Sequence, residues 1–149
     1  MASAVAPAPL RQEGTQFWAE LTEECKKQIS VLNCVLTEHG IRAADHVECH
    51  TGQQLRLIRS RYPSTSIHVS MIFEQWGPVL RVCIAGHEGN QPGILQQEFE
   101  MPLATDVDGC IVGVFDEGRS LCPRELASYL VQHFRHCFPR ISLPCPDAA

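Results

Sequence analysis

The chain has 149 residues, a common size for one domain, of which 44% are hydrophobic and 19% are charged. Such a chain can bury a core without disulfides or metal, and it lies far from the composition of disordered proteins. Seventeen acidic against twelve basic residues give a net charge of −5 with neutral histidines. The electrostatic field of this negative net charge repels phosphate backbones and anionic lipids, so we expect neither nucleic acid nor a membrane as partner.

The sequence carries no recognisable targeting segment. The first ten residues, MASAVAPAPL, lack a basic start, and Pro7 and Pro9 interrupt any apolar stretch of a signal peptide. The longest apolar runs fall far short of the roughly 18 residues that span a bilayer. The eight cysteines form no CxxC pair, and several lie in apolar stripes, as buried cysteines do in a reducing compartment. We therefore expect a soluble, cytoplasmic protein.

Residues 1–14 show no periodicity and are interpreted as a disordered leader. Thr15 can cap a long helix that ends before Gly40. Apolar residues recur three or four apart along it, the spacing that gathers side chains on one helix face; they are Phe17 or Trp18, Leu21, Cys25, Ile29, Leu32 and Leu36.

The hydrophobic period changes to two in the middle of the chain. Residues 67–76 and 80–85 alternate as two strands of a β-hairpin, with Gly77-Pro78 as the expected turn. Further strands are predicted at about 53–61 and 94–101. Residues 110–115 are apolar on both faces, which is typical of a central strand covered on both sides or of one whose second face is buried in a dimer.

A second helix is predicted after Gly118, with Pro123 at its first position and Pro139 at its end. Residues 140–149 form a proline-rich tail, which leaves a single domain over residues 15–139. The predicted fold class is α+β: an antiparallel sheet of four to five strands, flanked by a long N-terminal helix and a C-terminal helix on one face of the sheet.

The other sheet face is the candidate binding surface. It would carry a mixed apolar and polar set of side chains, as protein interfaces do: His68, Ile72, Trp76, Val79, Arg81 and Cys83. The leading hypothesis is a non-enzymatic interaction module that uses this face or a sheet edge. Its partner would be another protein or a second copy, as in a homodimer, and an assembly or secretion chaperone is one form of it.

Cys122 is the candidate catalytic residue of the alternative hypothesis, a thiol- or metal-dependent enzyme or sensor. It precedes Pro123 at the start of the second helix, where backbone donors and the helix dipole favour a thiolate. A cysteine that only fills a cap position explains the same pattern more simply.

His133, His136 and Cys137 are candidate metal ligands, because a helix places them on adjacent faces and their side chains suit zinc. His46, Cys49 and His50 form a second cluster. Neither spacing matches a standard zinc signature, so we predict no metal and no cofactor.

A phosphate-binding patch of Arg56, Arg59 and Arg61 with Tyr62 is the weakest alternative, since solvated strand positions also explain these arginines. The chain has no GxSxG, HExxH or glycine-rich phosphate loop. The balance of these observations is against an enzyme.

Overall fold

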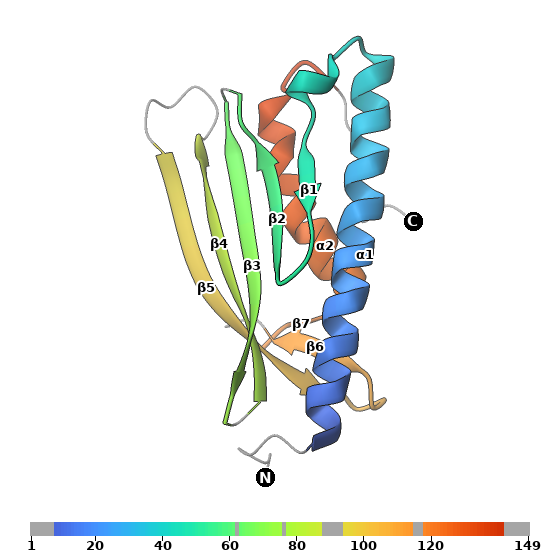
Figure 1. Ribbon diagram of the computed structural model, residues 1–149, viewed down its shortest axis with the longest axis vertical. Helices are drawn as coiled ribbons and strands as arrows, with labels where there is room; N and C mark the ends of the chain where they lie inside the picture. Colours follow the sequence, from blue (N-terminus) through green and yellow to red (C-terminus); the bar gives the residue numbers. More distant parts are fainter. Residues whose placement is uncertain (1–7, 62, 76, 88–93, 115–117, 142–149) are drawn as a thin grey trace.

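A computed structural model describes residues 8–61, 63–75, 77–87, 94–114 and 118–141 (Figure 1). It consists of one antiparallel sheet and two long helical segments. The elements in chain order are α1 (Ala8–Glu38), the 3-10 turn η1 (Ala43–Asp45), β1 (Glu48–His50), β2 (Gln54–Arg59), β3 (Thr65–Glu74), β4 (Gly77–His87), β5 (Ile94–Thr105), β6 (Ile111–Val114), β7 (Ser120–Leu121), α2 (Pro123–Val131) and the 3-10 helix η2 (Gln132–Cys137).

The α+β class is confirmed, but the sheet has seven strands and not the expected four to five. Each strand pairs antiparallel with the next one along the chain, in the order β1 to β7. The two strands that the sequence does not reveal are β1, with three residues, and β7, with two. Such short strands show no alternation of their own and form because they add to the edges of an existing sheet.

The helix α1 begins at Ala8 and not at Thr15. Leu10, Gln12 and Glu13 are good helix formers, and Pro9 is tolerated in a first helical turn, whose N–H groups have no partner within the helix. The expected end is confirmed: Gly40 has a φ of +79°, and the Ile41 N–H donates to the Leu36 carbonyl at 2.9 Å. This is the glycine-terminated helix end that the sequence predicts.

The predicted hairpin is also present, with its reversal two residues earlier than expected. Glu74 pairs with Gly77, so Pro78 lies within β4 opposite Phe73. The predicted second helix continues past Val131 as the 3-10 helix η2 and ends at Cys137.

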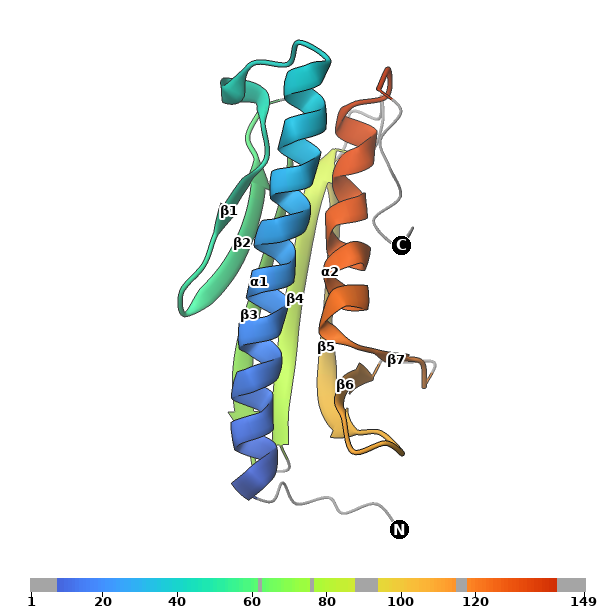
Figure 2. The ribbon, with the colours of Figure 1, turned by 90° about the vertical axis from the view of Figure 1, so that its right-hand side faces the viewer.

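Both helices cover the same face of the sheet, which we call the inner face (Figure 2). The main core lies between them and the strands. Its members include Phe17, Leu21, Ile29 and Leu36 from α1, Leu55, Leu57, Ile67, Val69, Leu80, Val82 and Met101 from the sheet, and Leu126, Leu130 and Phe134 from the C-terminal helical segment. In the part of the chain that is described, no helix is long and apolar enough to cross a membrane.

The backbone at Gly86 in β4 lies close to Ser64 and Thr65, where the loop after β2 enters β3. A Cβ at Gly86 would lie 2.6 Å from the Ser64 carbonyl oxygen and 3.0 Å from the Thr65 Cα. Backbone atoms cannot rotate away as a side chain can.

We therefore expect Gly86→Ala to lower the free energy of unfolding by about 1–3 kcal/mol, the usual cost of overpacking. Urea unfolding followed by circular dichroism measures it. Ser70→Ala, at a β3 position on the other sheet face, is the control and should change stability by less than about 0.5 kcal/mol. Equal unfolding midpoints for Gly86→Ala and the native chain would contradict this packing.

Candidate functional site

The face of the sheet away from the helices, the outer face, carries every described residue of the predicted binding surface. Strand register aligns its side chains in rows across the strands. Row 1 is Arg56, His68, Cys83 and Glu98; row 2 is Gln54, Ser70, Arg81 and Glu100; row 3 is Ile72, Val79 and Pro102. Of the predicted surface residues, Trp76 lies outside the described residues.

The register pairs the predicted residues directly. His68 lies opposite Cys83, and Ile72 lies opposite Val79. Arg81 forms an ion pair with Glu100 from the next strand, with 2.9 Å between Nη2 and Oε2. This hydrogen bond and the charge of Glu100 raise the pKa of Arg81, so Arg81 has a partner within its own chain.

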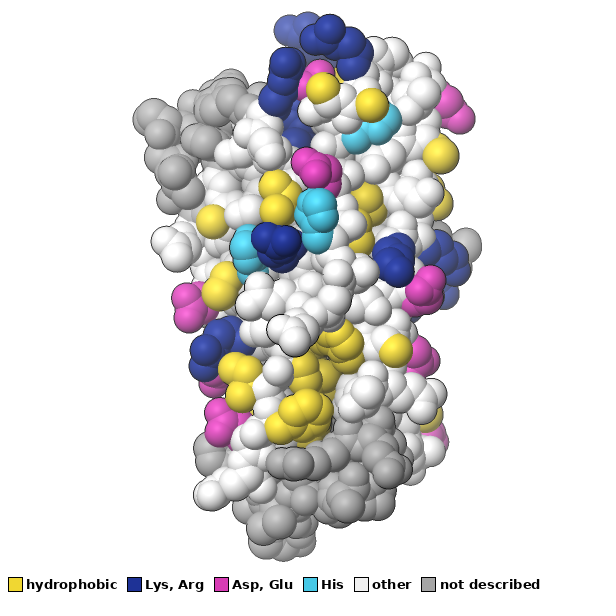
Figure 3. Space-filling view, in the orientation of Figure 1, with side chains coloured by type: hydrophobic (Ala, Val, Ile, Leu, Met, Phe, Trp, Pro, Cys, Tyr) yellow, Lys and Arg dark blue, Asp and Glu magenta, His cyan; other side chains and the backbone are white. Residues whose placement is uncertain are grey.

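Row 3 belongs to a small apolar cluster at one end of the outer face. Val79 and Val112 are only 5% and 7% exposed, yet neither belongs to the main core. The even-numbered residues of β5 and β6 extend row 3 on the same face, so the outer apolar cluster comprises Ile72, Val79, Pro102, Ala104, Val112 and Val114. In Figure 3, where the strands lie in front of α2, hydrophobic side chains gather low on the molecule, with histidine and basic side chains above them.

The Cys83 thiol in row 1 is not activated. Partial burial raises its pKa, and the charge of Glu98 and a hydrogen bond with it raise it further. The outer face therefore presents neutral sulfur at neutral pH.

His136 and Cys137 do meet, although His133 does not join them. The His136 Nε2 lies 3.7 Å from the Cys137 Sγ and 3.1 Å from the Thr65 Oγ1. The His133 Nδ1 instead contacts the carbonyl of Tyr129 on its own helix at 2.9 Å. Thr65, at the start of β3, is a neighbour that helix spacing alone could not reveal.

Arg59 completes this cluster from β2. It is 7% exposed, and its guanidinium donates to the carbonyls of Asp45, Arg61 and Pro63 at 2.7–3.2 Å. Its Cζ lies 4.6 Å from the Phe138 ring centroid, in cation–π contact. Arg59 therefore ties the turn before β1, the loop after β2 and the end of η2 together.

The chemistry of Cys137 follows from its burial. Desolvation raises the pKa of its thiol, and the contacts with Thr65 and Arg59 offset only part of that effect. The thiol is therefore protonated at neutral pH.

The two histidine and cysteine clusters do not combine into a metal site. Across the described ranges, no three His, Cys, Asp or Glu side chains lie close enough together to hold a metal ion. The His46 Nε2 contacts the Ile41 carbonyl at 3.1 Å, and His50 contacts Glu48 at 3.2 Å. Cys49 is half-buried against the core.

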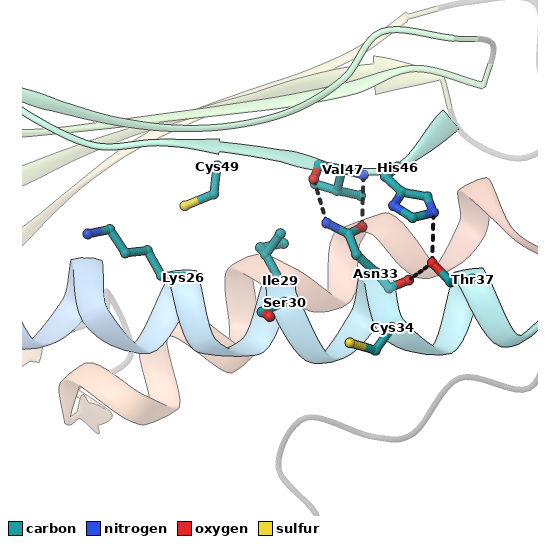
Figure 4. Close-up of a pocket in the computed structure, with 9 residues that line it drawn as sticks. All are labelled: Lys26, Ile29, Ser30, Asn33, Cys34, Thr37, His46, Val47 and Cys49. Atoms are coloured by element: carbon teal, nitrogen blue, oxygen red, sulfur yellow. Dashed lines mark hydrogen bonds between the residues drawn. The ribbon is translucent and has the colours of Figure 1, made fainter. Parts of the chain in front are cut away.

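A groove of about 430 Å³ runs between α1 and the segment that leads into β1 (Figure 4). The Asn33 amide bridges it by donating to the Val47 carbonyl at 2.9 Å and accepting from the Val47 N–H at 3.1 Å. Thr37 approaches His46 at 3.5 Å. The Asn33 amide is thus paired with the Val47 backbone, and these bonds hold the segment before β1 against the helix.

Cys122 occupies the predicted cap position of α2, beside a hollow of about 750 Å³. The Glu125 carboxylate accepts the Cys122 N–H at 3.0 Å. Sequence reasoning predicts a lowered thiol pKa, but burial raises it and the Glu125 carboxylate adds to that, outweighing the backbone donors.

The three arginines near β2 do not form a common patch. Arg56 is exposed on the outer face, Arg59 is buried, and Arg61 forms an ion pair with Asp45 at 3.0 Å. Tyr62 lies outside the described residues.

The predicted binding surface lacked two residues of the outer face, Arg56 on β2 and Glu98 on β5. The alternation of side chains along these two strands was the sequence signal that could have found them.

No protein-family model, no curated protein and no solved structure matches this chain. The outer face, its rows and the Cys137 cluster are therefore interpreted from their own geometry.

The pKa directions predict the order in which the thiols react. At neutral pH, the exposed Cys34 and Cys110 should label first with iodoacetamide, whereas the fully buried Cys25 should label only after unfolding. Cys83, Cys122 and Cys137 have raised pKa values, so they react slowly until the pH rises toward those values. Peptide mapping by mass spectrometry measures this, with the urea-unfolded chain as control. A native Cys122 or Cys137 that labels faster than in urea would contradict it.

Proposed function

We propose that this protein is a non-enzymatic interaction module that binds a protein partner through the outer face of its sheet. One observation carries the proposal. Both helices lie on the inner face (Figure 2), while the outer face bears its own apolar cluster beside rows of paired polar side chains.

The chemistry of the outer face suits a protein partner. Apolar side chains such as Ile72 and Pro102 supply area for a desolvated centre, and the charged rows beside them supply a polar rim. Each of these two rows carries one arginine and, on β5, one glutamate, and the chain as a whole is acidic, which disfavours nucleic acid.

An assembly or secretion chaperone is a narrower form of this proposal, because such proteins are also small, acidic and built in the order helix, sheet, helix. The proposed compartment is the cytoplasm, where free thiols such as the half-buried Cys49 and Cys83 persist.

Thiol chemistry at Cys137 is the second candidate function. The 3.7 Å separation of Cys137 Sγ and His136 Nε2 favours it, because a histidine within reach can accept the thiol proton. The raised pKa of Cys137 opposes it, and the labelling experiment above decides between the two.

A photo-crosslinking residue tests the proposed surface directly. We expect its incorporation at His68, exposed in the centre of the outer face, to give a discrete adduct in cells, because the partner covers that position. The same residue at Val31, 53% exposed on α1, is the matched control and should give none. Denaturing gels and mass spectrometry identify the adduct. Adducts from both positions, or from neither, would overturn the proposal.

A further inference from the structure

We infer that the partner of the outer face is a second copy of this chain. The two copies pack face to face about a two-fold axis that runs along the strands, between β3 and β4. This inference rests on the proposed function, since it names the partner of the same surface.

The axis has a simple consequence for the rows. Rotation about a line parallel to the strands exchanges the β2 side of the face with the β5 side and leaves each residue in its own row. Arg56 of one copy therefore faces Glu98 of the other, and Glu98 faces Arg56. His68 faces Cys83 in the same way, because the register places all four in row 1.

The charges of row 1 are complementary under this rotation. Arg56 and Glu98 stand at opposite ends of the row, both exposed. Among the residues that the structure describes, neither has an ion-pair partner within 4.0 Å. Within its own chain Glu98 hydrogen-bonds the Cys83 thiol and its charge acts on Arg81. Across the interface, Arg56 and Glu98 form two equivalent ion pairs.

The other rows are compatible with the same axis. In row 3, Ile72 faces the position of Val79 of the second copy; because Val79 is only 5% exposed, the accessible apolar area of this row comes from the half-buried Ile72 and the exposed Pro102. In row 2, Arg81 faces Ser70 of the second copy and keeps its own Glu100. No like charges are opposed in any of the three rows.

The area is sufficient for a weak, reversible dimer. The four strands β2 to β5 have 6, 10, 11 and 12 residues. At about 3.3 Å per residue and about 4.8 Å between strands, they present a face of about 600 Å². Two such faces bury roughly 1,200 Å², the lower limit for a specific interface. The dimer should therefore dissociate on dilution, and its state must be measured over a concentration series.

Charge reversal tests the pairing. Light scattering coupled to size-exclusion chromatography should show a dimer for the native chain at high concentration. Arg56→Glu and Glu98→Arg should each weaken dimerisation by tenfold or more, because each replaces two attractive pairs by two repulsive ones. The double variant should restore the dimer, and so should a mixture of the two single variants, since a mixed dimer has two opposite-charge pairs.

Matched controls exclude effects of net charge. Arg42→Glu and Glu38→Arg, both at exposed positions near the end of α1, change the charge equally and should leave the dimer unchanged. Circular dichroism verifies that each variant folds. A native chain that stays monomeric, a dimer that ignores both reversals, or a mixture that fails to restore it would each overturn the inference.

Cys83 provides a second measurement on otherwise native protein. A short bis-maleimide, used at a pH high enough to ionise the thiol, should link the two Cys83 residues because they flank the axis. Cys83→Ser should abolish the linked dimer, whereas Cys34→Ser should not. A product that survives Cys83→Ser would contradict this arrangement. A monomeric chain whose His68 position crosslinks to a different protein would overturn the dimer and leave the proposed function standing.

Discussion

The structure depends on one constraint: alternate side chains of each strand point to opposite faces of the sheet, and both helices cover the same face. Burial on the inner face lets Leu57, Val69 and Leu80 pack against α1 and α2, and the hydrophobic effect of that packing drives folding. The same alternation places His68, Arg81 and Glu98 on the outer face. Core and candidate surface are therefore two consequences of one strand geometry.

Burial also determines the chemistry of the cysteines. Sequence patterns suggested activation at Cys122 and metal binding near Cys137, yet in both thiols desolvation raises the pKa. A helix N-terminus or a neighbouring arginine lowers a thiol pKa only where its stabilisation of the thiolate exceeds the cost of desolvating that thiolate. Packing therefore keeps the Cys122 and Cys137 thiols protonated at neutral pH.

The candidate surface shows how far sequence patterns extend. Alternation in β3 and β4 predicted that His68, Ile72, Arg81 and Cys83 share a face, and their places on the outer face agree with that. It could not predict that Arg56 and Glu98 align with His68 and Cys83, because register between strands depends on the turns and on core packing. Nor could it place Thr65 and Arg59 beside Cys137, since these residues are far apart along the chain.

The sequence by itself determined the α+β class, the core stripe of α1, its end at Gly40 and the hairpin of β3 and β4, because period and glycine conformation act over a few residues. Tertiary structure alone decided the strands β1 and β7, whose two or three residues carry no periodic signal. It also decided the alignment of the outer rows and the ionisation of the buried thiols. These properties depend on which distant segments meet and on how much water they exclude.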